Sequence, residues 1–136
     1  MNTMTRLSAV FAGGALGGLT NAFAVWLFGR YGLAAALGVS IAPPFTPPWL
    51  YHRLVWGGIW GFAFLLPLFK RHWFAKGLVI SFGPTLVQLL VVFPDQAHKG
   101  MLGLDLGLLT PLLVFFYNAV WGWTAAFWIK SSGYGS

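Results

Sequence analysis

The sequence contains no cysteine, and this absence removes several kinds of chemistry. Disulfide bonds, thiolate nucleophiles, iron–sulfur clusters and thiolate zinc sites are all excluded. Cysteine usage therefore does not indicate whether the protein resides in an oxidising or a reducing compartment.

Charged residues are also scarce: they make up 7% of the chain, whereas soluble domains average about 25%. Hydrophobic residues make up 58%, and eight Lys and Arg against two Asp and Glu leave a net charge of +6. So few charged side chains cannot keep this much apolar surface in water, so a lipid bilayer is the expected solvent and partner. Nucleic acid is not expected as a partner, because the chain has no soluble basic face.

Hydropathy predicts four membrane-spanning helices, at about 7–28, 54–69, 77–93 and 106–129. A spanning helix needs roughly 17–25 residues, so the second and third spans are short. Short spans recruit flanking residues, thin the bilayer or pack inside an oligomer. We therefore expect an all-α fold, an integral membrane bundle of four transmembrane helices that forms a single domain over residues 1–136.

Residues 32–42 form an apolar stretch that is too short to cross a membrane. Pro43 and Pro44 stop it, because proline cannot continue a helix. The stretch predicts a half-helix that either lies at the membrane interface or re-enters the protein. A re-entrant segment is tolerated only where its backbone is buried in protein or lines a water-filled cavity.

The basic residues predict the orientation of the chain, since cytoplasmic loops carry an excess of Lys and Arg. Both termini are expected in the cytoplasm, because that orientation places more basic residues inside than outside. The inner set is Arg6, Lys70, Arg71, Lys76 and Lys130, and the outer set is Arg30, Arg53 and Lys99.

Glycines four residues apart recur in the first and second spans. Closely spaced small residues let membrane helices approach without a hydrophobic driving force, so these positions predict helix–helix packing within the monomer or in an oligomer. The alternative is that the glycine face lines a narrow pore. The positions are Gly13, Gly14, Gly17, Gly18, Gly57 and Gly61.

Asn21, Gln88 and Asn118 lie near the middle of three predicted spans. A side-chain amide in lipid needs a partner, so interhelical hydrogen bonds are expected. These amides, with Asp105, are also the candidates for a polar lining around a small solute or ion. Asp105 is a functional candidate if it lies at membrane depth, and an ordinary first-turn carboxylate if it begins the fourth helix.

Most tryptophans are expected at the membrane–water interfaces, including Trp121, Trp123 and Trp128 at the end of the fourth span. Trp56 and Trp60, four residues apart, could instead flank a pocket for a lipid tail or a quinone.

No residue pattern indicates catalysis or a bound cofactor. The histidines match no metal-binding spacing, and the glycines lack the lysine and following Ser or Thr of a phosphate-binding loop. His52, Asp95 and His98 share the predicted outer side and are the candidates for an enzyme at the interface. We expect no catalytic residues, no metal site and no cofactor.

Two runs, Tyr51–Gly61 and Pro84–Pro94, resemble a pattern that recurs in small multi-pass inner-membrane proteins of proteobacteria that have no assigned activity. The resemblance implies a bacterial inner (plasma) membrane location and implies no functional residue.

These patterns together predict a non-catalytic accessory or structural subunit of a membrane complex. The closely spaced glycines, the short spans and the small extramembrane mass support that hypothesis. The alternative is a small homo-oligomeric channel or transporter, because a bundle of this size is too small to enclose a pathway alone.

Overall fold

A computed structural model of the chain describes residues 3–39, 41, 45–66, 72–91 and 101–132. All regular structure in these residues is helical. The long helices are α1 (Thr3–Arg30), α3 (Pro47–Gly61), α4 (Trp73–Val87) and α5 (Thr110–Ser131). The short ones are α2 (Leu33–Ala36) and the 3₁₀ turns η1 (Phe62–Leu65) and η3 (Met101–Leu106).

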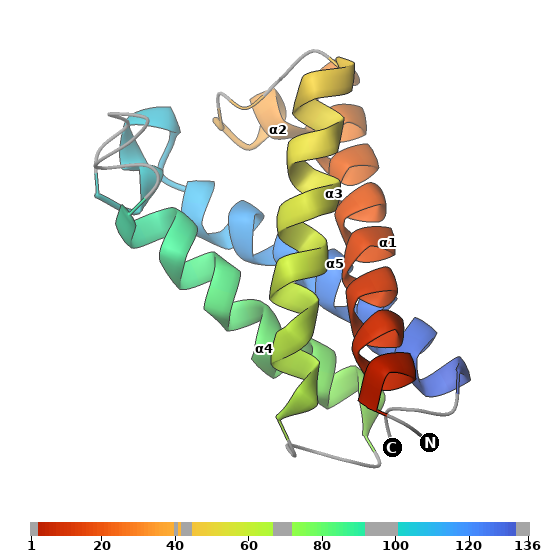
Figure 1. Cartoon of the computed structure of the whole chain (residues 1–136). Helices are drawn as coiled ribbons and strands as arrows, with labels where there is room; N and C mark the ends of the chain where they lie inside the picture. Colours follow the sequence, from red (N-terminus) through yellow and green to blue (C-terminus); the bar gives the residue numbers. More distant parts are fainter. Residues whose placement is uncertain (1–2, 40, 42–44, 67–71, 92–100, 133–136) are drawn as a thin grey trace.

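The four long helices alternate in direction along the bundle (Figure 1). Helix α1 packs against α3 and α5, and α5 packs against α4. Helices α3 and α4 diverge and make at most marginal contact, so the bundle is closed on three sides and open on the fourth (Figure 1).

Three helices are long and apolar enough to cross a membrane: Thr3–Arg30, Trp73–Val91 and Thr110–Ser131. Their outward faces carry large exposed side chains such as Phe23, Phe82 and Leu112, as expected for surfaces in contact with lipid. The second predicted span is placed differently, since its helix begins at Pro47 and changes to a 3₁₀ turn after Gly61. Proline suits the first helical turn, where its missing N–H has no partner to lose.

Of the half-helix expected over 32–42, the structure has a single turn, α2 (Leu33–Ala36); residues 37–39 and 41 are not helical, and residues 40 and 42 lie outside the described residues. Gly38 stops α2 with a φ of 74°. The amide of Gly38 donates to Ala35 and that of Val39 to Ala34, both at 2.9 Å, which is the Schellman arrangement of a helix C-terminus. The segment is therefore too short to be a re-entrant helix.

The first residues of α4 and α5 change the positions that the sequence predicted for Lys76 and Asp105. Helix α4 begins at Trp73, so Lys76 lies in its first turn and is 8% exposed, rather than in a loop. Helix α5 begins at Thr110, and Asp105 belongs to the preceding turn η3, so Asp105 is not a first-turn residue of the helix. Leu102 and Gly103 adopt positive φ, which kinks the chain inside η3, and Gly107, with a φ of 148°, follows the turn before α5 begins.

Helix α4 is irregular at its end. Pro84 interrupts its hydrogen bonding, and the hydroxyl of Thr85 donates to the carbonyl of Ser81 at 2.7 Å. Residues 88–91 continue as a π-helical turn, so Gln88 stands where the helix widens. Such π turns are found most often at functional sites.

Candidate functional site

Glycines set the distance between α1 and α3. A Cβ atom on Gly14 would overlap the carbonyl of Gly57 and approach the Cα of Gly61 to 2.8 Å. A Cβ atom on Gly18 would overlap the carbonyl of Arg53 in the same way. The two backbones therefore touch along this line, and no larger residue fits there without moving the helices apart.

The other two predicted glycines of α1 face α5. A Cβ on Gly17 would lie 2.5 Å from the carbonyl oxygen of Trp121, and one on Gly13 would lie 3.0 Å from Ile129. The six predicted glycines thus meet partners within one chain. A third close approach, between Gly77 of α4 and Gly122 of α5, was not predicted, because neither glycine belongs to a four-residue repeat.

Trp121 is a core residue, so its assignment to the membrane interface is wrong. Its side chain is 3% exposed, and its indole N–H is shared between the carbonyls of Gly14 at 3.1 Å and Gly57 at 3.3 Å. The glycines leave these carbonyls uncovered by side chains, so an indole from α5 reaches both. One tryptophan thereby joins α1, α3 and α5.

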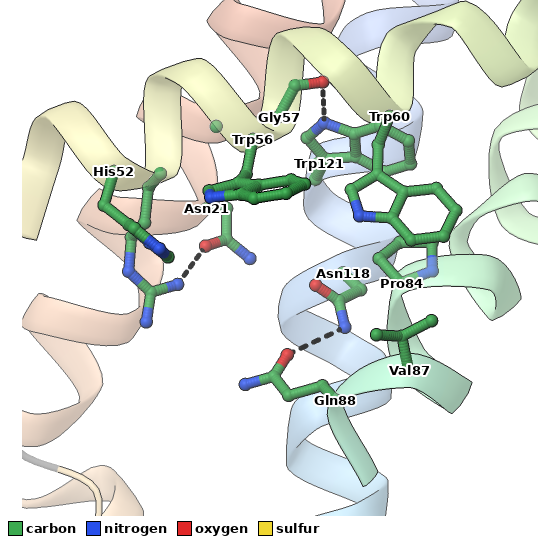
Figure 2. A pocket seen from close by; sticks show the side chains of 12 residues that line it. Asn21, His52, Trp56, Gly57, Trp60, Pro84, Val87, Gln88, Asn118 and Trp121 are labelled. Atoms are coloured by element: carbon green, nitrogen blue, oxygen red, sulfur yellow. Dashed lines mark hydrogen bonds between the residues drawn. The ribbon is translucent and has the colours of Figure 1, made fainter. Parts of the chain in front are cut away.

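A cavity of about 400 Å³ lies beside this core, in the space where α3 and α4 diverge (Figure 2). We call it the lateral cavity. It is within the usual volume range of small-molecule sites, roughly 300–1,000 Å³. Its walls are Gly18 and Asn21 of α1; His52, Arg53, Trp56, Gly57 and Trp60 of α3; Pro84, Val87 and Gln88 of α4; and Asn118 and Trp121 of α5.

One side of the lateral cavity is held by Asn21. Its amide nitrogen donates to the carbonyl of Tyr117 at 2.8 Å, and its oxygen accepts from the guanidinium of Arg53 at 2.6 Å (Figure 2). The guanidinium also lies over the ring of Trp49, 4.6 Å from the ring centre. Asn21 therefore connects α1 with both α5 and α3, and it positions a cation at the cavity wall.

The opposite side is held by Asn118. Its amide nitrogen donates to the hydroxyl of Thr85 at 3.1 Å and, in a longer bond, to the side-chain oxygen of Gln88 at 3.4 Å (Figure 2). These bonds tie α5 to α4. The amide nitrogen of Gln88 bonds to no other residue in the described part of the chain, so it is available to a ligand.

Three of the four polar residues predicted from the sequence, Asn21, Gln88 and Asn118, line this one cavity. The fourth, Asp105, has a side chain outside the described part of the structure. Asp95 and His98, candidates for an interfacial enzyme site, also lie outside the described residues. In the ranges that are described, no three His, Asp or Glu side chains come close enough to hold a metal ion.

Arg53 is the cavity residue that the sequence analysis missed. Its place beside the second predicted span predicts a residue on the outer side, because a basic residue next to a span usually marks the end of that span. Helix α3 begins six residues earlier, at Pro47, which moves Arg53 into the helix. The two prolines at its start were the signal that could have located it.

Comparison of the chain with protein-family models, with curated proteins and with solved structures gives no match. The candidate site therefore stands on its own geometry. That geometry is a cation and three amides on the walls of a cavity whose remaining surface is largely tryptophan, valine and proline.

Proposed function

We propose that this chain is a non-catalytic integral membrane protein whose lateral cavity binds one amphipathic molecule from the bilayer. The observation that carries the proposal is the mixed character of the cavity walls. Asn21, Arg53 and Gln88 contribute hydrogen-bonding groups to the walls, and Trp56, Trp60 and Val87 provide the apolar part. A few placed polar groups in a mostly apolar pocket are typical of sites for small organic molecules.

The membrane arrangement that supports this proposal has four crossings. Helix α3 and η1 run without a break over residues 47–65, and this segment rises by about 30 Å, the thickness of the hydrocarbon core. With α3 as a crossing, the gap between α3 and α4 opens sideways into lipid. We place the beginning of α1 and the end of α5 on the cytoplasmic side of a bacterial inner membrane, because Arg6, Lys76 and Lys130 lie at that end.

A cavity-filling substitution tests the binding function. Val87→Trp places a large ring in the lateral cavity, and Val79→Trp makes the same change on an exposed face of α4 that does not line it. We expect the wild-type protein and Val79→Trp to retain one amphipathic molecule per chain in native mass spectrometry from nanodiscs. Val87→Trp should retain none. Equal retention by both variants would show that the cavity is not the binding site.

An accessory or structural role in a membrane complex is the cellular context we propose for this binding. The divergence of α3 and α4 leaves one side of the bundle without a neighbouring helix, which suits contact with partner subunits or with further copies of this chain. Native mass in a mild detergent tests this role. A complex of defined stoichiometry supports it, and a monomer in both detergent and nanodiscs contradicts it.

A channel formed by several copies is the second candidate. It is favoured by one observation, the gathering of Asn21, Gln88 and Asn118 from three helices around one cavity. In that case Asn118→Leu should abolish solute flux in proteoliposomes while leaving the native mass unchanged. Unchanged flux would exclude this candidate.

A further inference from the structure

Arg53 carries more hydrogen-bonding capacity than its protein neighbours use. A guanidinium has five N–H donors, and its one hydrogen bond within the described residues goes to Asn21. The Nε atom is buried and has no partner in this part of the chain, and the ring of Trp49 covers one face of the group without accepting a hydrogen bond in the plane. Among the side chains that the structure describes, none that lines the lateral cavity is acidic.

The depth of Arg53 makes this unused capacity costly. It lies six residues after the start of α3, which corresponds to roughly 9 Å along the helix axis. If α3 crosses the membrane, the guanidinium lies below the headgroup level, where an arginine without a counter-charge is unfavourable. A lipid phosphate drawn toward it would supply that charge, and arginine commonly extends toward phosphates in this way.

A second donor faces the same space from the opposite wall. Gln88 accepts from Asn118 through its oxygen, which leaves its amide nitrogen to donate into the cavity. Figure 2 shows Gln88 and Asn118 on one side of the cavity, with His52 and Asn21 across from them. Donors on two walls match the several acceptor oxygens of a phosphodiester.

The remaining surface suits an acyl chain. Trp56 and Val87 are 51% and 40% exposed, so the apolar wall continues from the cavity to the outside of the bundle. Trp60 also lines the cavity, and its ring lies against Gly83 of α4. A chain attached to the bound headgroup therefore has an apolar path between α3 and α4 into the bilayer.

We propose that the lateral cavity selects an anionic phospholipid, with the phosphodiester on Arg53 and Gln88 and one acyl chain between α3 and α4. The inference rests on the proposed binding function and adds the class of ligand. The chain has eight basic and two acidic residues, and this net positive charge also favours an anionic lipid.

The test is competition between two lipids that share the phosphodiester and differ in the net charge of the headgroup, because choline adds a quaternary ammonium. The protein is reconstituted in nanodiscs of equal parts phosphatidylglycerol and phosphatidylcholine, and the lipid retained on each chain is identified by native mass spectrometry. Because both lipids offer the same phosphodiester, the expected preference comes from the choline ammonium, which phosphatidylcholine would bring next to the guanidinium of Arg53. We expect the wild-type protein to prefer phosphatidylglycerol by roughly tenfold, since like charges in a partly buried site repel. Arg53→Gln should bind both lipids equally.

Two matched variants distinguish the effect of the charge on Arg53 from the effect of the overall positive charge of the chain. Arg30→Gln removes an exposed arginine that stacks on Trp26 outside the cavity, and it should keep the preference. Arg53→Lys keeps the charge but loses the planar group, and it should keep part of the preference even if Arg53→Gln fails to fold.

The outcomes distinguish this inference from the function on which it rests. Equal retention of the two lipids by the wild-type protein, with Val87→Trp still blocking retention, would overturn the anionic preference and leave the binding function intact. Retention that Val87→Trp does not block would overturn the binding function itself. Displacement of the lipid by inorganic phosphate alone would also overturn the inference, since the cavity would then be a site for soluble anions.

Discussion

The interface between α1 and α3 and the gap between α3 and α4 are built from opposite kinds of residue. At the first, Gly14 and Gly57 bring two backbones into contact and leave no space. At the second, the ring of Trp60 lies against Gly83 in place of a backbone contact, and a cavity of about 400 Å³ remains. The same helix α3 takes part in both, with Gly57 and Gly61 toward α1 and Trp60 toward α4.

The difference indicates how a small helical bundle combines a closely packed part with an open cavity. Dispersion contacts and interhelical hydrogen bonds hold membrane helices together, and both need close approach. Where glycines permit that approach, as between α1 and α3, the helices form a fixed frame. Where bulky side chains prevent it, polar groups are left facing an open space. Four substitutions test this contrast, from the largest expected effect to the smallest.

Gly14→Leu should have the largest effect on stability. The new side chain would overlap the backbone of Gly57 and Gly61, so the helices must separate, at a cost of about 3 kcal/mol or more. Thermal unfolding in nanodiscs should show a large fall in the midpoint. The control is Val55→Leu on the exposed face of α3, where Val55 is 51% exposed and no such fall is expected. A folded Gly14→Leu protein with wild-type stability would contradict this account of the interface.

Asn21→Leu should destabilise the protein by about 2 kcal/mol, because it leaves the guanidinium of Arg53 and the carbonyl of Tyr117 without their hydrogen-bond partner. A double-mutant cycle with Arg53→Gln measures the coupling between the two side chains. Thr20→Val, on the same helix, is the control and removes a hydroxyl that donates to the carbonyl of Gly17 or bonds to Thr124, neither of which involves Arg53. Additive effects of the Asn21 and Arg53 substitutions would mean that their contact contributes nothing.

Trp121→Phe should cost about 1–1.5 kcal/mol, since the ring is largely kept while the indole N–H shared by Gly14 and Gly57 is lost. Trp128→Phe on the same helix, where the side chain is 44% exposed, should change the free energy of unfolding much less. The measurement is chemical unfolding of both variants beside the wild type. Equal effects would show that the indole bond does not secure the frame.

Gln88→Leu should have the smallest effect, about 0.5 kcal/mol, because its bond to Asn118 is long and its side chain is only partly buried. Thr85→Val, which removes the shorter bond at 3.1 Å, should cost more. Comparison of the two in one unfolding assay checks the order. An effect of Gln88→Leu as large as that of Asn21→Leu would mean that the α4 wall is packed as tightly as the α1 interface.

Part of the candidate site was accessible from the sequence. Amides are rare in apolar spans and need partners, so Asn21, Gln88 and Asn118 stood out, and all three line the lateral cavity. Arg53 did not stand out, because a basic residue near a span boundary has an ordinary explanation. The error followed from the position of the helix start, and hydropathy locates boundaries less well than it locates the spans themselves.

Trp121 illustrates a second limit. Hydropathy cannot separate a tryptophan at the membrane surface from one in the core, because the indole ring has both apolar and polar parts. Its burial depends on two glycines in other helices, Gly14 and Gly57, whose carbonyls accept its N–H. The half-helix prediction failed for a more local reason, since Gly38 takes a positive φ and ends α2 after one turn.

Composition alone determined that this chain is helical and suited to a membrane, because backbone polar groups in lipid are satisfied within helices and 58% of the residues are hydrophobic. The glycine spacing determined which faces of α1 and α3 could approach closely. The tertiary structure decided which helices meet, that α3 and α4 stay apart, and that Arg53 shares a cavity with three amides. Those relations join residues distant in the chain, and they depend on packing geometry that no local pattern contains.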